Sequence, residues 1–342
     1  MDEPHYETCM FKLVQPLFQP RMLAPFEKGK NSVNLQFIIP GLQIASEDKD
    51  NYNKLIRNCI NDVWGSQIQE LKNNETDAKA SFIEIAFYID HSENEGENQQ
   101  IMENRSRIII ERLLGVISFC AGMKVSAINV IPTMTSGPSY QMVLHPKNKT
   151  ERPKIKFSIP QELIEGRAPS SEIFTALFWL RRGLAEHDPI DTYNAFMVCL
   201  QILARNWWDK KLTSGCVMNK PQARKCPYCE NELPLMEKCP KCDASLMSEI
   251  PPTGFLFREY ITTEFGVSRS KVKKVWGLRN AIAAHGNKID IDADDFIGLT
   301  ELKFDAANWA YQGINRALGL TSDSAPKPSQ DFFMTDALMN LD

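Results

Sequence analysis

The chain has 342 residues and a formal net charge of -4, with 43% hydrophobic and 24% charged residues. At about 150 residues per domain this length predicts roughly two domains, and the composition is ordinary for a globular protein. The acidic balance argues against a uniformly basic nucleic-acid surface, no apolar run reaches the ~18 residues of a membrane helix, and the N-terminus lacks a signal-peptide pattern. We therefore expect a cytoplasmic protein that makes no membrane contact.

Residues 1–160 mix strand-like and helix-like stretches, which predicts an α+β domain. Short β-rich runs bounded by Pro, Gly or charged clusters predict strands at 33–39, 81–89, 141–145 and 154–159. Amphipathic patterns predict helices at 51–72 and 103–121, and the polar stretch 91–100 predicts a solvated loop. The domain contains no phosphate-binding loop and no nucleophile elbow. Its expected role is that of a sensor or recruiter, to which a regulatory protein or ligand would bind.

Residues 161–320 predict an all-α helical bundle. The expected helices cover residues 171–188, 189–208, 255–265, 268–286 and 292–318. Serine caps open the first and fourth of these, Pro189 begins the second, and Gly266 and Gly286 end the third and fourth. The remaining residues, 321–342, predict a flexible linker and a C-terminal tail.

Two closely spaced cysteine pairs interrupt the helical pattern between the second and third helices. The pairs are Cys226 with Cys229 and Cys239 with Cys242. Four thiolates at this spacing suit tetrahedral Zn²⁺ and leave no open position, so the metal is expected to be structural. The alternatives are two redox-active pairs or accidental spacing. We predict a zinc ribbon inserted at 216–248. Its five basic residues are nearly balanced by four acidic ones, so it is poorly suited to general nucleic-acid binding.

Arg279 stands out in the fourth helix of the predicted bundle. On a helical wheel the apolar residues form one stripe, made of Val272, Val275, Trp276, Ile282 and Ala283. Arg279 lies in the middle of this stripe, although burying an unpaired arginine costs several kcal/mol. Either it forms a buried salt bridge or this face lines a cleft or a subunit interface. His285 follows six residues later beside Gly286, where we expect the backbone to unwind and the ring to turn back towards the arginine.

The neighbourhood of Arg279 is strongly basic. Residues 251–288 contain seven Lys or Arg against two acids, Glu259 and Glu264, in a chain that is acidic overall. A local basic field around an arginine and a histidine favours a phosphodiester substrate.

Asn280 directly follows Arg279, and five residues separate Arg279 from His285. This motif resembles the Arg…His signature of the HEPN superfamily. The two helices before it, with their Asp188-Pro189 junction, are similar to the first two helices of the Apea-like HEPN group. The likeness covers about residues 170–318, a little under half of the chain. The second helix of that group commonly carries an acid where this chain has Gln201, so no acidic partner for Arg279 is expected from that position.

The resemblance implies a helical bundle that forms a homodimer and cleaves RNA without a metal. Carried onto this chain, His285 would move protons at the ribose 2′-hydroxyl or the leaving oxygen, and Arg279 would stabilise charge on the scissile phosphate. Asn280 would orient these groups, and the zinc would take no part in the chemistry. The hypothesis that follows is an endoribonuclease acting as a bacterial defence or stress effector, such as a toxin or phage-defence protein.

Two other classes of function remain open from the sequence. One is a non-catalytic HEPN module that binds RNA, a nucleotide or a protein partner. The other is an interaction scaffold in which Arg279 forms a structural salt bridge and His285 complements the dipole at the end of its helix.

Overall fold

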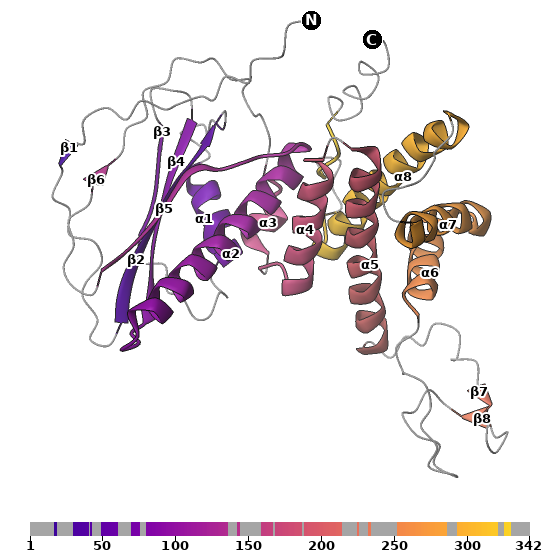
Figure 1. Cartoon of the computed structure of the whole chain (residues 1–342), viewed down its shortest axis with the longest axis horizontal. Helices are drawn as coiled ribbons and strands as arrows, with labels where there is room; N and C mark the ends of the chain where they lie inside the picture. Colours follow the sequence, from indigo (N-terminus) through magenta and orange to yellow (C-terminus); the bar gives the residue numbers. More distant parts are fainter. Residues whose placement is uncertain are drawn as a thin grey trace, which may run out of the picture. The chain divides into compact units, whose positions relative to one another are not determined.

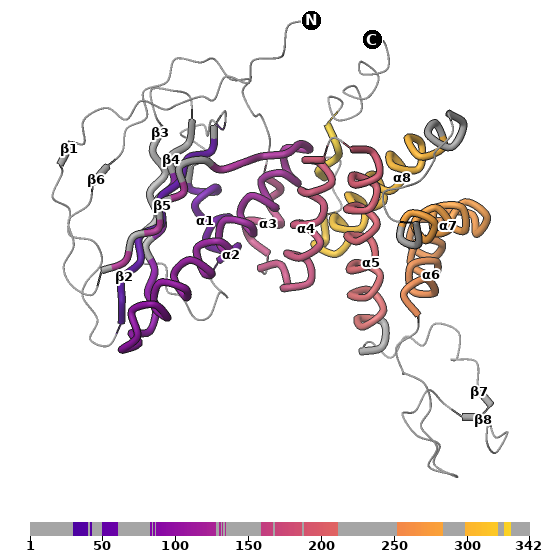
Figure 2. Tube along the Cα trace, in the orientation of Figure 1, coloured from indigo at the N-terminus to yellow at the C-terminus, as the bar shows by residue number. Residues whose placement is uncertain are grey.

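The chain forms two compact units in the computed structural model. Figure 2 follows its backbone from the N-terminus to the C-terminus. The described residues are 17–18, 30–40, 42, 49–60, 70–75, 80–135, 142–143, 159–166, 168–186, 188–213, 224–225, 232–233, 252–285, 293–320 and 325–329. The first unit comprises Met1–Pro169 and Ser322–Ser329, and the second comprises Ser170–Thr321 and Gln330–Asp342. None of the helices in these ranges is long and apolar enough to cross a membrane.

An antiparallel sheet forms the centre of the first unit (Figure 1). Its strands, in spatial order, are β3 (Glu70–Glu75), β4 (Ala80–Asp90), β2 (Lys30–Pro40) and β5 (Ile128–Thr135). A separate pair joins β1 (Leu17–Phe18) to β6 (Met142–Val143). Alternate apolar residues of β2 and β4 lie opposite one another in register, in the pairs Val33 with Phe87, Leu35 with Ile85 and Phe37 with Ile83. All six side chains are buried, which fixes the register of the central pair.

Three helices accompany the sheet: α1 (Lys49–Ile60), α2 (Glu95–Ala121) and α3 (Gln161–Glu165). Helix α2 packs against α1 and against strands β4 and β5. Asn94 caps α2, because its Oδ1 accepts hydrogen bonds from the backbone N–H groups of Gly96 and Glu97. The side chain of Asn58 in α1 donates to the carbonyls of Leu163 and Ile164, which ties α3 to the first unit. The two units therefore divide after Pro169 rather than after residue 160.

Several of the predicted elements in this unit were wrong or incomplete. The helix expected over 51–72 ends at Ile60, and residues 70–72 belong to strand β3. The loop expected over 91–100 is helical from Glu95 onwards. Of the strand expected at 141–145, the structure describes only Met142–Val143, which form β6, and β5 was not predicted. The strand expected at 154–159 lies, apart from its last residue, outside the described residues.

The expected linker beyond residue 321 includes a segment that packs against the first unit. Pro326 is buried, and the N–H of Ser329 donates to the carbonyl of Gly122 at 2.9 Å. Gly122 ends α2 with a φ of 68°, and a Cβ there would collide with the carbonyl of Lys327. This contact requires glycine for two reasons, the positive φ and the close approach of the returning chain.

The second unit is all-α in its long elements, which confirms the predicted division into an α+β part and a helical part. Its helices are α4 (Ser171–Gly183), α5 (Pro189–Thr213), α6 (Thr253–Phe265), α7 (Arg269–His285) and α8 (Ala293–Leu318). Helix α5 is central, because it packs against each of the other four helices. Its buried face includes Tyr193, Phe196 and Leu200.

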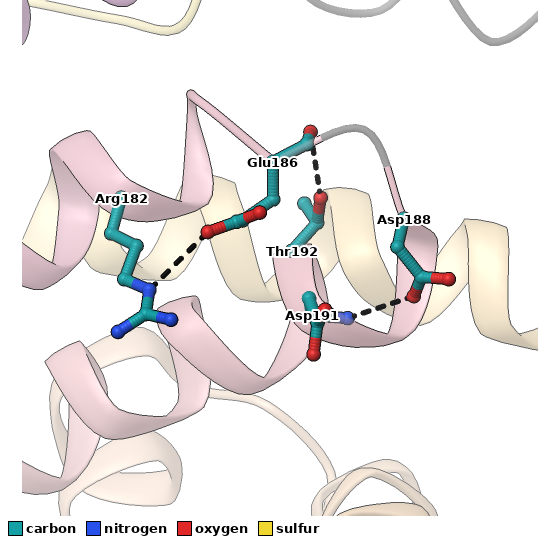
Figure 3. A network of polar contacts seen from close by, with 5 residues as sticks. All are labelled: Arg182, Glu186, Asp188, Asp191 and Thr192. Carbon is teal, nitrogen blue, oxygen red and sulfur yellow. Dashed lines mark hydrogen bonds and ion pairs between the residues drawn. The ribbon is translucent and has the colours of Figure 1, made fainter. Parts of the chain in front are cut away.

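Polar contacts fix the corner between α4 and α5 (Figure 3). The carboxylate of Asp188 accepts hydrogen bonds from the N–H groups of Ile190 and Asp191, so it caps α5 just before Pro189. The hydroxyl of Thr192 donates to the carbonyl of Glu186, and the Glu186 carboxylate accepts from Arg182 at 3.3 Å. The Asp188-Pro189 junction is therefore a helix-start signal that also sets the direction in which α5 leaves α4.

Candidate functional site

Helix α7 holds Arg279 on the face that packs into the bundle. Ser268 caps the helix, with its hydroxyl oxygen accepting from the N–H of Lys271. The side chains of Val272, Val275 and Ile282 are buried, at 0%, 0% and 3% exposure. The predicted apolar stripe is thus confirmed at these three positions, and Arg279 lies between them around the helix.

The Arg279 side chain is half-buried and contacts two neighbours on its own helix. Its guanidinium carbon lies 5.3 Å from the centre of the Trp276 ring, and Nη1 donates to Oδ1 of Asn280 at 3.3 Å. Within the described part of the chain no carboxylate pairs with Arg279. The salt bridge that a purely structural arginine would form is therefore not found among these residues, and the charge remains available to an external anion.

Tyr193 of α5 supports the helix beside Arg279. Its hydroxyl donates to the carbonyl of Val275 at 2.6 Å, in a buried contact between the two helices. Burial raises the pKa of Tyr193, and the nearby positive charge of Arg279 opposes that shift. The tyrosine is therefore a neutral hydrogen-bond donor that anchors the turn of α7 carrying Arg279.

Trp276 is the surface on which Arg279 lies, and α6 holds it in place. The rings of Trp276 and Phe257 have centroids 5.2 Å apart. Gly254 allows the backbone of α6 to approach, because a Cβ there would lie 2.7 Å from Cε2 and 2.8 Å from Nε1 of the indole. The position of the arginine thus depends on packing between α6 and α7.

Helix α7 ends at His285, in agreement with the helix end predicted from Gly286. The side chain of His285 lies outside the described part of the structure, so its expected turn towards Arg279 stays a prediction. Residues six apart on a regular helix are separated by about 9 Å along the axis and about 120° around it. The helix by itself therefore sets Arg279 and His285 on different sides of α7.

Gln201 of α5 does not provide a substitute for the acidic partner. It makes no hydrogen bond to Arg279, and its Nε2 is buried with no hydrogen-bond partner among the described groups. Gln201 therefore leaves Arg279 without a neutralising partner at this position of α5.

Most of the other cations of α6 and α7 do not form ion pairs with the described acids. Lys271 pairs with Asp305 of α8 at 2.6 Å. Glu264, one of the two acids in this segment, is engaged elsewhere, by Trp207 of α5 at 2.7 Å and Arg316 of α8 at 2.8 Å. No described carboxylate forms an ion pair with the four other basic residues of α6 and α7, namely Arg258, Arg269, Lys273 and Lys274. The predicted basic field is therefore a feature of these two helices.

A cavity of about 250 Å³ lies between α6 and α7. It is lined by Phe255, Arg258, Glu259, Thr262, Arg269, Val272 and Lys273. Sequence reasoning missed this cavity, although the lining residues recur at spacings of three and four along each helix, which marks one face of each. Three cations against one carboxylate make the lining positive.

Two paired strands flank the first cysteine pair in the sequence. Strands β7 (Arg224–Lys225) and β8 (Glu232–Leu233) are antiparallel, with Lys225 opposite Glu232 (Figure 1). The four cysteines themselves lie outside the described residues, and no group of three or more metal ligands occurs among the residues that are described.

Comparison with known proteins gives no assignment: no protein-family model matches the chain, and neither a curated protein nor a solved structure matches it.

Proposed function

We propose that the protein is a metal-independent endoribonuclease whose site contains Arg279, Asn280 and His285 in a HEPN-like helical bundle. The observation that carries this proposal is the state of Arg279. It is half-buried on the packed face of α7, it lies over Trp276, and no described carboxylate pairs with it. A half-buried guanidinium in a basic segment is suited to a phosphate, with which it can form two parallel hydrogen bonds.

The chemistry needs no oxidant and no metal. The ribose 2′-oxygen attacks phosphorus, the bond from phosphorus to the 5′-oxygen breaks, and the product is a 2′,3′-cyclic phosphate. The proton released by the 2′-hydroxyl equals the one that the leaving 5′-oxygen takes up, and His285 transfers it. Arg279 stabilises the additional negative charge on the phosphate oxygens, and Asn280 holds the guanidinium through its side-chain oxygen.

A homodimer through the helical bundle completes the site in this proposal. Arg279 and His285 lie about 120° apart around one regular helix, so a single α7 does not bring them face to face. A two-fold axis beside α7 would set Arg279 of one protomer opposite His285 of the partner subunit. This arrangement is the one that the family resemblance implies.

We also propose that Cys226, Cys229, Cys239 and Cys242 hold a structural Zn²⁺. The pairing of β7 with β8 supports this, because the two strands flank the first cysteine pair in the sequence, and two thiolates at CxxC spacing can reach one ion. Four thiolates saturate the metal, so it would stabilise the inserted segment and supply no catalytic water.

The proposal is tested by incubating the full chain with structured and unstructured RNAs in EDTA. The variants are Arg279→Ala, His285→Ala and, as a matched control, Lys274→Ala, which removes an exposed cation of the same helix. We expect cleavage with 2′,3′-cyclic phosphate ends by the wild type and the control, and a loss of at least about 100-fold in rate for the other two.

Folding is checked by denaturant titration of each variant. Arg279→Ala should change the free energy of unfolding by about 1 kcal/mol or less, because it removes a cation–π contact and leaves no orphaned carboxylate among the described residues. Retained cleavage by both active-site variants would place the chemistry elsewhere. Absence of cleavage by the wild type would favour the alternative, a non-catalytic module that binds RNA, a nucleotide or a protein partner.

A further inference from the structure

The cavity between α6 and α7 has the chemistry of a site for a nucleic-acid strand. Arg258, Arg269 and Lys273 surround it and have no ion-pair partner among the described acids, whereas Glu259 is the single carboxylate in its lining. Its floor includes Val272, which is completely buried, and Thr262, which offers a hydroxyl. Clustered Arg and Lys side chains that form no ion pairs within the protein are typical of sites that bind phosphate groups.

Phe255 adds a second kind of contact at the same cavity. Its side chain is 39% exposed, which is unusual for phenylalanine, and its ring meets Trp208 of α5 edge-on at 6.2 Å. That leaves ring surface open beside three cations. Interleaved aromatic and basic side chains are the combination by which proteins hold single-stranded nucleic acid, since each base has a face that can stack.

The cavity and Arg279 are connected along one face of α7. Arg269, Lys273, Trp276 and Asn280 follow one another at spacings of four, three and four residues, which places them within about 60° of one another around the helix. Trp276 packs on Phe257 and Gly254 of α6, and Arg279 contacts both Trp276 and Asn280. From Arg269 to Asn280 this face is about 16 Å long, so one bound strand could occupy the cavity and reach the arginine.

The size of the cavity argues for part of a polymer rather than a whole small molecule. At about 250 Å³ it is smaller than the roughly 300–1,000 Å³ of most sites that enclose a ligand. An acidic peptide would satisfy the cations, but it would make no use of an exposed ring beside them. These observations favour single-stranded RNA.

We infer that the groove lined by Phe255, Arg258, Arg269 and Lys273 binds single-stranded RNA and leads it along α7 to Arg279. The inference rests on the proposed function, because it makes the groove the path by which the substrate of the proposed nuclease reaches Arg279. Phosphates bind the three cations, and one base stacks on Phe255. Glu259 can accept a hydrogen bond from a base amino group or a ribose hydroxyl.

The test measures binding without cleavage, so that failure of the groove and failure of the nuclease can be told apart. The probe is a fluorescent 12-residue 2′-O-methyl oligouridine, which has no free 2′-hydroxyl to attack phosphorus, and the readout is anisotropy at several salt concentrations. Lys273→Ala is compared with Lys274→Ala. These adjacent lysines are both exposed, but only Lys273 lines the groove, and Lys274 lies about 100° further around the helix.

We expect Lys273→Ala to lower the slope of log affinity against log salt by about 0.7 and to weaken binding about fourfold at 0.15 M salt, whereas Lys274→Ala changes neither. Phe255→Leu keeps an apolar contact with Trp208 but loses the ring, so binding should fall about fivefold or more with an unchanged slope. Two results would overturn the inference. One is an equal effect of Lys273→Ala and Lys274→Ala, and the other is tighter binding of a polyglutamate than of the oligouridine of equal charge. If the protein bound the probe through the groove but cleaved no RNA, the groove would be supported as a binding site and the nuclease proposal would be refuted.

Discussion

The substitution Gly254→Ala tests how closely α6 and α7 pack around Trp276. An added Cβ would lie 2.7, 2.8 and 2.9 Å from three atoms of the indole. The ring has little room to retreat, because Phe257 beside it is completely buried. Overpacking of this kind costs about 1–3 kcal/mol, and the better helix propensity of alanine returns at most about 1 kcal/mol. We therefore expect Gly254→Ala to lower the free energy of unfolding by up to about 2 kcal/mol.

Gly277→Ala is the matched control for that variant. Gly277 is an exposed residue next to Trp276, and a Cβ there would meet nothing within 4 Å. It should stabilise the protein by about 0.5–1 kcal/mol, because alanine in a helix interior loses less backbone entropy than glycine.

Urea titrations followed by circular dichroism measure both changes, and RNA cleavage measured on the same samples reports the effect on the site. Displacement of Trp276 moves the surface under Arg279, so Gly254→Ala should also lower cleavage while Gly277→Ala does not. The reasoning would be refuted if the two alanine variants stabilised the protein equally.

Two further predictions concern pH and metal. Burial raises the pKa of Tyr193, Tyr260 and Cys199, whose ordinary values are 10.0, 10.0 and 9.0, so above about pH 9 the unfolded chain holds fewer protons than the folded one. The free energy of unfolding should then fall with rising pH, by up to about 1.4 kcal/mol per pH unit for each group. Thermal unfolding between pH 8 and 11 measures this fall, and a constant Tm over that range would contradict the prediction. For the metal, elemental analysis should find one zinc per chain. The zinc content should fall in Cys226→Ser and in Cys239→Ser but not in the control Cys216→Ser. Full zinc content in Cys239→Ser would exclude the four proposed cysteines as the ligand set.

The helices of the second unit could be predicted because each carries its own local signals. Gly266 ends α6 at a φ of 65°, Ser268 caps α7, and Asp188 with Pro189 starts α5. The buried positions of α7 also follow from periodicity alone. That Arg279 lies on this face was therefore predictable, whereas its neighbours on α5 and α6 were not, since nothing in the local pattern says which helix packs against it.

The first unit was harder to predict because its elements depend on pairing between distant residues. Strand β3 has the polar sequence of residues 70–75 and owes its conformation to its register with β4. Strand β5 contains Pro132, which normally argues against a strand; it is tolerated because β5 lies at an edge of the sheet. Helix α2 begins in a polar stretch where apolar periodicity is weak, and the signal that could have located its start is the capping residue Asn94.

The return of residues 325–329 to the first unit has a consequence for the order of synthesis. The segment that closes on Gly122 is translated only after helices α4 to α8, because the chain leaves the first unit at Pro169 and comes back at Ser322. The usual rule, in which the N-terminal domain is finished first on the ribosome, therefore does not hold here. Helices α4 to α8 are all synthesised while the α+β unit still lacks its last segment, so a nascent chain acquires the helices of the proposed RNA-cleaving part before its proposed sensor is fully assembled.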